Sequence, residues 1–196
     1  MRYLVLIITV YLLSTGSLQA QHQEHTSEYA GQENREIKSL SQSDIDQLKE
    51  GKGWGLAKAA ELNGVPGPSH ILDMGKEIDL SDNQQIKIQE IFVDMQKKAI
   101  ETGIQLISKE KELNHAFASK EVSQLILRIL TSELGELRGN LTFIHLEAHL
   151  KAAEVLTKEQ ISLYNELRGY NLMNPCSEVP EGHDPEMWKR HNNCED

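Results

Sequence analysis

Residues 80–84 read Leu-Ser-Asp-Asn-Gln, and this stretch decides how the chain folds. Ser81 suits a helix N-cap, because its hydroxyl can accept a hydrogen bond from the amide three residues on while Gln84 reaches back to the amide of Ser81. Asp82 favours the positive end of the helix dipole. The stretch therefore predicts a helix that begins directly after Ser81, with Leu80 leading into it.

A second stretch of the same design, Leu-Thr-Lys-Glu-Gln, occupies residues 156–160. Thr157 takes the N-cap and Gln160 the third helical position, while Leu156 is placed to pack on Ile161 as a hydrophobic staple. We expect a closing helix from residue 158 to about residue 168, ending at Gly169.

Each of these two stretches is a capping box, in which the N-cap side chain and the glutamine three residues on bond to each other's backbone amides. Between the two boxes, apolar residues recur at the three-to-four spacing of one helical face, first over residues 88–117 and then over residues 122–152. No proline occurs between residues 69 and 174. A turn at residues 118–120, with Ser119 capping the second helix, would make antiparallel neighbours of roughly 35 residues, each about 50 Å long. The prediction is an all-α fold, a long antiparallel helical hairpin with shorter flanking helices.

The flanking helices are expected before the hairpin. Ser43 can cap a helix that the glycines of residues 51–55 break into two pieces. Residues 64–68, Gly-Val-Pro-Gly-Pro, predict a turn. A short helix should follow from residue 69 to about residue 78.

The first twenty residues have the features of a secretory signal peptide, since Arg2 precedes an apolar run and small and polar residues follow as far as Ala20. The run is too short to span a bilayer, which takes about 20 residues. We expect export to the periplasm, cleavage after Ala20 and no stable membrane anchor. Residues 21–40 should be a polar flexible tail, residues 41–170 the helical domain and residues 171–196 an irregular tail containing Cys and His.

The composition excludes some functions. The chain has 20 Lys and Arg against 30 Asp and Glu, a formal charge of −10. Nucleic-acid binding depends on clustered cations, so no nucleic-acid partner is expected. The sequence also lacks a Gly-x-Ser-x-Gly elbow, a phosphate-binding glycine loop and a His-Glu-x-x-His motif, which favours a binding protein over an enzyme.

Several apolar residues fall outside the main stripes and would be covered by a homodimer or contact a client: Ile86, Val93, Ile100 and Leu127.

The order of these motifs, a signal peptide, a Ser81 box, a hairpin and a Thr157 box, resembles the LTxxQ-motif superfamily of periplasmic proteins over about residues 69–169. That superfamily includes Spy/CpxP-like stress chaperones and periplasmic heavy-metal sensor and resistance proteins. The resemblance implies an ATP-independent chaperone or envelope-stress adaptor, with unfolded periplasmic proteins or an envelope sensor protein as partners. The alternative is a periplasmic heavy-metal sensor or buffer.

A metal site is predicted around His145 and His149, which are four residues apart and therefore share one helical face. Such a pair can chelate a divalent transition metal such as Zn, Cu, Ni or Co. A third ligand would come from His70 or Met74, from Glu147 or from a second subunit. Sensor relatives use His, Glu and Met ligands near such a pair, and His70 and Met74 match those types. The alternative is two half-exposed histidines on a solvated face.

The two cysteines, Cys176 and Cys194, lie in the C-terminal tail. An exported protein meets an oxidising compartment, where two cysteines usually pair, so we predict a disulfide between them. Metal binding by the tail, which also holds His183 and His191, and free thiols are the alternatives.

Overall fold

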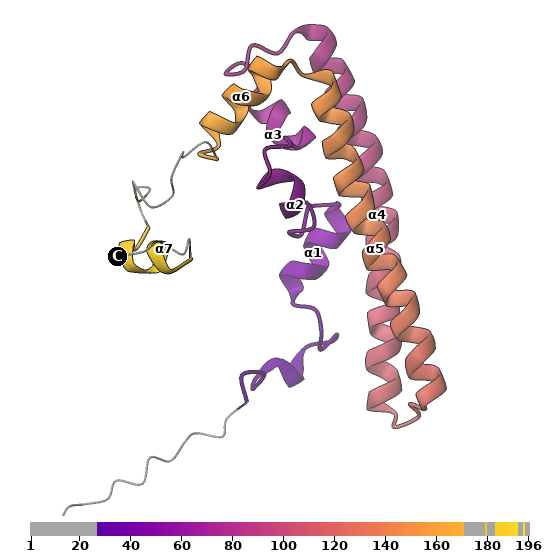
Figure 1. Cartoon of the computed structure of the whole chain (residues 1–196). Coiled ribbons are helices and arrows are strands. Elements are labelled where there is room, and N and C mark those ends of the chain that lie inside the picture. Colours follow the sequence, from indigo (N-terminus) through magenta and orange to yellow (C-terminus); the bar gives the residue numbers. More distant parts are fainter. Residues whose placement is uncertain (1–26, 171–178, 180–182, 192–193, 195–196) are drawn as a thin grey trace, which may run out of the picture. The chain divides into compact units, whose positions relative to one another are not determined.

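The structure, a computed structural model, describes residues 27–170, 179, 183–191 and 194. The chain divides into two units, Met1–Glu33 and Asn34–Asp196, and the features discussed below belong to the second. In the described residues there is no strand, and the predicted all-α fold with a long helical hairpin is confirmed (Figure 1). A short 3-10 turn, η1 (Gln32–Asn34), precedes the helices, which are α1 (Gln42–Glu50), α2 (Lys58–Glu61), α3 (Pro68–Asp73), α4 (Asp82–Ala118), α5 (Gln124–Val155), α6 (Lys158–Leu167) and α7 (Pro185–His191).

The hairpin consists of α4 and α5, which pack against each other side by side (Figure 1). α4 has 37 residues and α5 has 32. The prediction that Ser119 caps the second helix is wrong, because Ser119 is the C-cap of α4 and its amide donates to carbonyls of the last turn. Lys120 then adopts a left-handed φ of 60°. The chain reverses direction at Lys120, before α5 begins. Ser123 caps α5 by accepting a hydrogen bond from the amide of Ile126.

The open end of the hairpin is joined by the side-chain amides of Gln84 and Gln160. Each closes its own capping box, with Ser81 at the start of α4 and Thr157 at the start of α6. Gln84 Nε2 lies 2.8 Å from Gln160 Oε1 and also donates to the carbonyl of Val155, at 2.9 Å. Gln160 Nε2 lies 3.1 Å from Gln84 Oε1. The two boxes are therefore one hydrogen-bonded unit that holds together the start of α4, the end of α5 and the start of α6.

An apolar cluster lies at the same end of the hairpin. Its buried members come from α3, α4, α5 and α6 and from the turns that follow α3 and α5. Its buried residues are Ile71, Ile78, Ile88, Ala152, Leu156 and Tyr164. Leu156 and the half-buried Ile161 both belong to this cluster, at the two positions of the expected staple. α6 is thereby packed against the hairpin.

The segment before α1 is part of the core, which corrects the boundary of the predicted flexible tail at residue 40. Ile37 is completely buried and Leu40 is 2% exposed, and both pack in the cluster that joins α1 to the hairpin. The cap of α1 is Ser41, not Ser43 as predicted. The reason is Asp44, which occupies the third helical position and accepts back from the Ser41 amide, at 2.8 Å, so that only Ser41 completes a capping box.

α1 approaches α4 closely at Gly103. A Cβ atom added to this glycine would lie 2.5 Å from the carbonyl oxygen of Leu48. The contact is between backbones, so neither side can relax by turning a side chain. Gly103 is therefore the position that lets α1 pack on α4.

A buried carboxylate also ties the N-terminal segment to both long helices. Glu110 on α4 is only 4% exposed and pairs with Arg138 on α5. Its other oxygen accepts a hydrogen bond from the Ser39 hydroxyl, at 2.6 Å. The Arg138 guanidinium stacks 5.2 Å from the centre of the Trp54 ring, and Trp54 Nε1 donates to Asp44, at 2.8 Å. Both the charge and the hydrogen-bonding capacity of the carboxylate are thus satisfied.

No helix among the described residues is long and apolar enough to cross a membrane. The signal peptide predicted at residues 1–20, most of the predicted C-terminal tail and Cys176 lie outside the described residues. Export, cleavage after Ala20 and the Cys176–Cys194 disulfide therefore stay predictions.

The close approach at Gly103 predicts opposite effects for the same substitution at two helical glycines. Gly103→Ala should lower the free energy of unfolding by about 1–3 kcal/mol, because the added methyl group overpacks against the Leu48 backbone. Gly139→Ala is the matched control, since a Cβ there would meet nothing within 4 Å, and it should raise stability by about 1 kcal/mol. Urea denaturation followed by circular dichroism measures both; equal effects would contradict the packing described.

Candidate functional site

A cavity of about 680 Å³ lies between the hairpin and the short helices that precede it. Its walls come from the loop between α1 and α2, from α2, from the start of α3, from the middle of α4 and from α5, with Arg168 at the end of α6. The apolar part of the wall includes Trp54, Ala57, Phe92, Met95 and Ile100. The polar part includes Lys58, Glu61, His70, His145, His149 and Arg168.

The loop that forms one wall depends on left-handed backbone. As predicted, the glycines separate two helical pieces, and Gly51 ends α1 with a φ of 65°. A Cβ at Gly51 would lie 2.8 Å from the carbonyl oxygen of Gln96, so the loop approaches α4 as closely as backbone allows. Trp54 has a φ of 44°, a strained value for a bulky residue, and its ring is held by Arg138 and Asp44.

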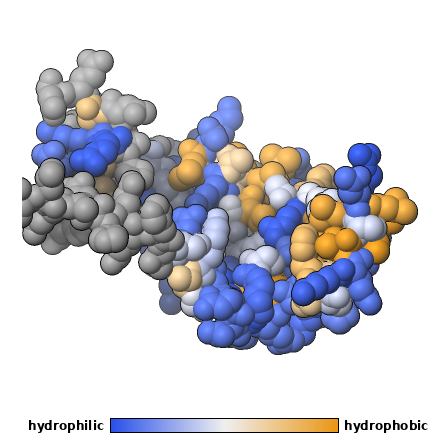
Figure 2. All heavy atoms as spheres, turned by 90° about the horizontal axis from the view of Figure 1, so that it is seen from below, coloured by the Kyte–Doolittle hydropathy of each residue, from blue (hydrophilic) through white to orange (hydrophobic). Residues whose placement is uncertain are grey.

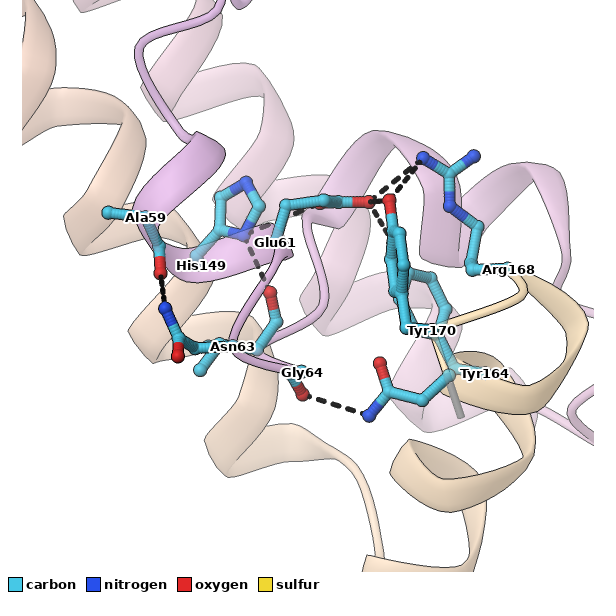
Figure 3. A network of polar contacts seen from close by, with 10 residues as sticks. Ala59, Glu61, Asn63, Gly64, His149, Tyr164, Arg168 and Tyr170 are labelled. Carbon is cyan, nitrogen blue, oxygen red and sulfur yellow. Dashed lines mark hydrogen bonds and ion pairs between the residues drawn. The ribbon is translucent and has the colours of Figure 1, made fainter. Parts of the chain in front are cut away.

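Glu61 is the centre of a polar network at the edge of the cavity (Figure 3). One carboxylate oxygen, Oε1, accepts hydrogen bonds from the hydroxyl of Tyr164 at 2.9 Å, from Arg168 Nη2 at 3.0 Å and from the hydroxyl of Tyr170 at 3.1 Å. Burial, together with the neighbouring carboxylate, raises the pKa of Tyr164, so its phenol stays a hydrogen-bond donor. The network joins α2 to α6 and neutralises the carboxylate with Arg168.

His149 is held by backbone on two sides. Its Nδ1 lies 2.9 Å from the carbonyl oxygen of Val65, and because a carbonyl only accepts, Nδ1 carries the proton. Nε2 is then the nitrogen with a free lone pair. A Cβ at Gly67 would lie 2.7 Å from this Nε2, so only glycine leaves room for the ring. Oε2 of Glu61 lies 3.9 Å from Nδ1 and reinforces this orientation.

His145, one turn before His149, is 3% exposed, and its Nε2 has no hydrogen-bond partner among the described residues. Burial disfavours the imidazolium and lowers the pKa of His145 below its ordinary value of 6.5, and the neighbouring His149 adds to this effect. The alternative prediction of two half-exposed histidines on a solvated face is therefore wrong. The reason is that the segment before α4 folds back and covers this face of α5. A buried polar atom without a partner is uncommon in proteins and calls for an explanation.

The four predicted metal ligands do not come together as a set. His70, His145 and His149 all line the cavity, whereas Met74 is not among its lining residues and packs instead against the apolar cluster at the open end of the hairpin. Met74 differs because α3 ends at Asp73, so that Met74 is its C-cap. Nowhere in the described part of the chain do three His, Cys, Asp or Glu side chains gather closely enough to hold a metal ion. The histidine pair is the part of the predicted site that the fold keeps.

The sequence prediction missed Lys58, Glu61, Phe92 and Arg168, which complete the cavity wall. They come from three separate segments, α2, α4 and the end of α6, and their spacing in the chain carries no signal of a common site. One sequence feature points to Glu61, which is a carboxylate between the apolar residues Ala60 and Leu62. Only the fold shows that Arg168 and two tyrosines lie opposite it.

Comparisons of the chain with protein-family models, with characterised proteins and with solved structures give no match. The resemblance to the LTxxQ-motif superfamily consequently stays a prediction from the two capping boxes.

The two histidines should respond differently to replacement by phenylalanine. His145→Phe should raise the free energy of unfolding at neutral pH by about 1 kcal/mol, because it removes a buried polar atom that has no partner. His149→Phe should lower it by about 1–3 kcal/mol, because it leaves the Val65 carbonyl without its donor. Thermal and urea denaturation measure both.

The lowered pKa of His145 also predicts how the stability of the chain depends on pH. Because the pKa of His145 is lower in the folded than in the unfolded chain, its contribution is present above about pH 6.5 and is lost as the pH falls towards the folded pKa. Stability should therefore decline as the pH falls below about 6.5, by at most about 1.4 kcal/mol per pH unit for this one proton. His145→Phe should flatten the decline; an unchanged slope would show that other groups cause it.

Proposed function

We propose that the chain is a periplasmic Spy/CpxP-like binding protein, an ATP-independent chaperone or envelope-stress adaptor that acts through its helical hairpin. The observation that supports the proposal is a group of exposed apolar side chains where α4 meets α5. Figure 2 views the molecule from below and includes a group of apolar residues at the surface on the side of the hairpin connection. The group, called the tip surface here, comprises Phe117, Leu125, Ile126, Leu127 and Ile129.

The tip surface is unusual because three of its residues are consecutive. Leu125, Ile126 and Leu127 point in different directions around the first turn of α5, about 100° apart, so one neighbouring helix could not cover all three. Leu125 is 68% exposed. Exposed apolar groups of this kind mark interaction sites, and side chains that point several ways suit extended segments of varied sequence.

A homodimer is part of the proposal. Further apolar residues are exposed along the hairpin away from the tip, at Val93 and Ile104 on α4 and at Phe143 and Leu150 on α5. A second copy would cover part of this surface and leave the tip for a client or for an envelope sensor protein. The formal charge of −10 keeps such a protein soluble and argues against nucleic acid as the partner.

Metal sensing or buffering is the second candidate, and it is favoured by the state of the two histidines. The Nδ1–H of His149 is bonded to a carbonyl, which is how proteins orient an imidazole whose Nε2 binds a metal. Nε2 of His145, one turn away, is free of hydrogen bonds. A divalent transition metal would take these two nitrogens, with His70 or a second subunit supplying a further ligand.

The chaperone proposal predicts that the tip surface carries the activity. The double variant Leu125→Ser with Leu127→Ser should need about tenfold more protein to suppress aggregation of a chemically denatured client, because two apolar contacts are lost. Leu62→Ser with Leu163→Ser is the matched control, since these leucines are 67% and 37% exposed, close to the 68% and 36% of Leu125 and Leu127, and lie outside both the tip surface and the residues assigned to the homodimer. Light scattering gives the readout. Equal losses in both variants, or no suppression by the native chain, would refute the proposal.

The metal candidate predicts binding that depends on the pair. Isothermal titration of the metal-free chain with Zn²⁺, Cu²⁺, Ni²⁺ and Co²⁺ should give a binding heat for at least one metal. The double variant His145→Ala with His149→Ala should weaken it by more than about tenfold. His115→Ala is the control, because His115 is exposed near the hairpin connection. Absence of heat with all four metals ends this candidate.

A further inference from the structure

The cavity described above has the size and lining of a site for a small organic molecule. Its volume of about 680 Å³ lies within the range of ligand sites in proteins, roughly 300–1,000 Å³. The aromatic rings of Trp54 and Phe92 and the aliphatic groups of Met95 and Ile100 line it. Such walls favour a ligand with an apolar body, which a bare metal ion does not have.

The charges around the cavity favour an anion. Three cationic side chains line it, Lys52, Lys58 and Arg168, against the two carboxylates of Glu50 and Glu61. Glu50 pairs with Lys52 at 2.6 Å, and Glu61 pairs with Arg168 at 3.0 Å. Lys58 is left without an ion-pair partner among the described residues, and its stem passes over Gly55, where a Cβ would lie 3.6 Å from Lys58 Cε. The cavity thus has one uncompensated positive charge in a chain of strongly negative net charge.

Two side chains that line the cavity each have a buried nitrogen without a hydrogen-bond partner in the described part of the chain. The nitrogens are Nε2 of His145 and Nε of Arg168. Nε of an arginine only donates, and a neutral imidazole can donate through Nε2. Because leaving buried donors unpaired costs stability, a ligand that accepts from them would recover that free energy on binding.

We propose that this cavity binds a small organic carboxylate with an apolar body. The carboxylate takes the positive charge of Lys58 and accepts from His145 Nε2 after the imidazole turns this buried nitrogen towards the cavity, and the body packs against Phe92, Met95 and Ile100. The proposal does not depend on the tip surface, which lies on a different part of the hairpin. It also differs from the metal candidate, because a metal at His145 and His149 needs neither Lys58 nor the apolar wall.

The test uses two carboxylates, 4-phenylbutanoate and octanoate, each with its uncharged amide. The full chain carries Trp188→Phe, so that Trp54 is the one remaining tryptophan and its fluorescence reports on the cavity. All titrations are done with EDTA present, which removes metal from the readout. At least one carboxylate should bind more tightly than about 5 mM and at least about tenfold more tightly than its amide.

Two substitutions locate the site. Lys58→Gln should weaken binding of the carboxylate about fivefold and leave the amide unchanged, whereas Lys97→Gln, an equal change of charge on an exposed part of α4, should change neither. His145→Phe should weaken carboxylate binding at least tenfold while the thermal midpoint stays the same or rises.

Three results would overturn the proposal. The first is no fluorescence or calorimetric response to either carboxylate, and the second is equal affinity for carboxylate and amide. The third is binding that is lost in the Leu125→Ser, Leu127→Ser variant but kept in Lys58→Gln and His145→Phe, which would place the ligand on the tip surface. Aggregation assays of the same variants report separately on the chaperone proposal, so the two proposals can fail independently.

Discussion

The amide pair of Gln84 and Gln160 is the interaction on which the remainder of the fold depends. Each glutamine closes a capping box at the start of its own helix, and each uses its remaining hydrogen-bonding capacity on the other box. A Glu at either position could close the capping box but could not donate to its partner. The pairing sets the relative position of α4, α5 and α6, and so places the long hairpin against which the earlier segments pack.

The segment before α4 packs along that hairpin through one close backbone contact and one buried charge. Gly103 leaves room for the backbone of α1 to contact α4. Glu110 accepts a hydrogen bond from Ser39 on one side and forms an ion pair with Arg138 on the other. Further along, the same segment covers the face of α5 that carries His145 and His149, and the cavity forms between them. Two of the buried polar atoms without hydrogen-bond partners, on His145 and Arg168, belong to residues that line this cavity. The tip carries a separate group of exposed apolar residues. Two separate surfaces of the molecule are therefore candidates for binding.

The accuracy of the sequence predictions follows the range of the interactions involved. The hairpin and both capping residues at its open end depend on spacings of three or four residues, and these are readable from the chain. The errors at Ser43 and Ser119 arose where several residues could act as caps, and the Asp44 side chain and the turn at Lys120 decided between them. The tail boundary was wrong because Ile37 and Leu40 are isolated apolar residues in a polar stretch, and only contact with α4 and α5 buries them.

The sequence alone determined the helices between residues 41 and 170, their order and the pairing of the two long ones, because these follow from local capping, helical periodicity and the absence of proline. It did not predict α7 (Pro185–His191), which lies in the stretch expected to be irregular. It also placed His145 and His149 on one face of a helix. The tertiary structure alone decided that this face is buried, that Met74 is not part of the cavity and that Lys58, Glu61 and Arg168 are. Those outcomes depend on which segments meet across the fold, and no spacing along the chain encodes how closely glycines such as Gly67 and Gly103 let two backbones approach.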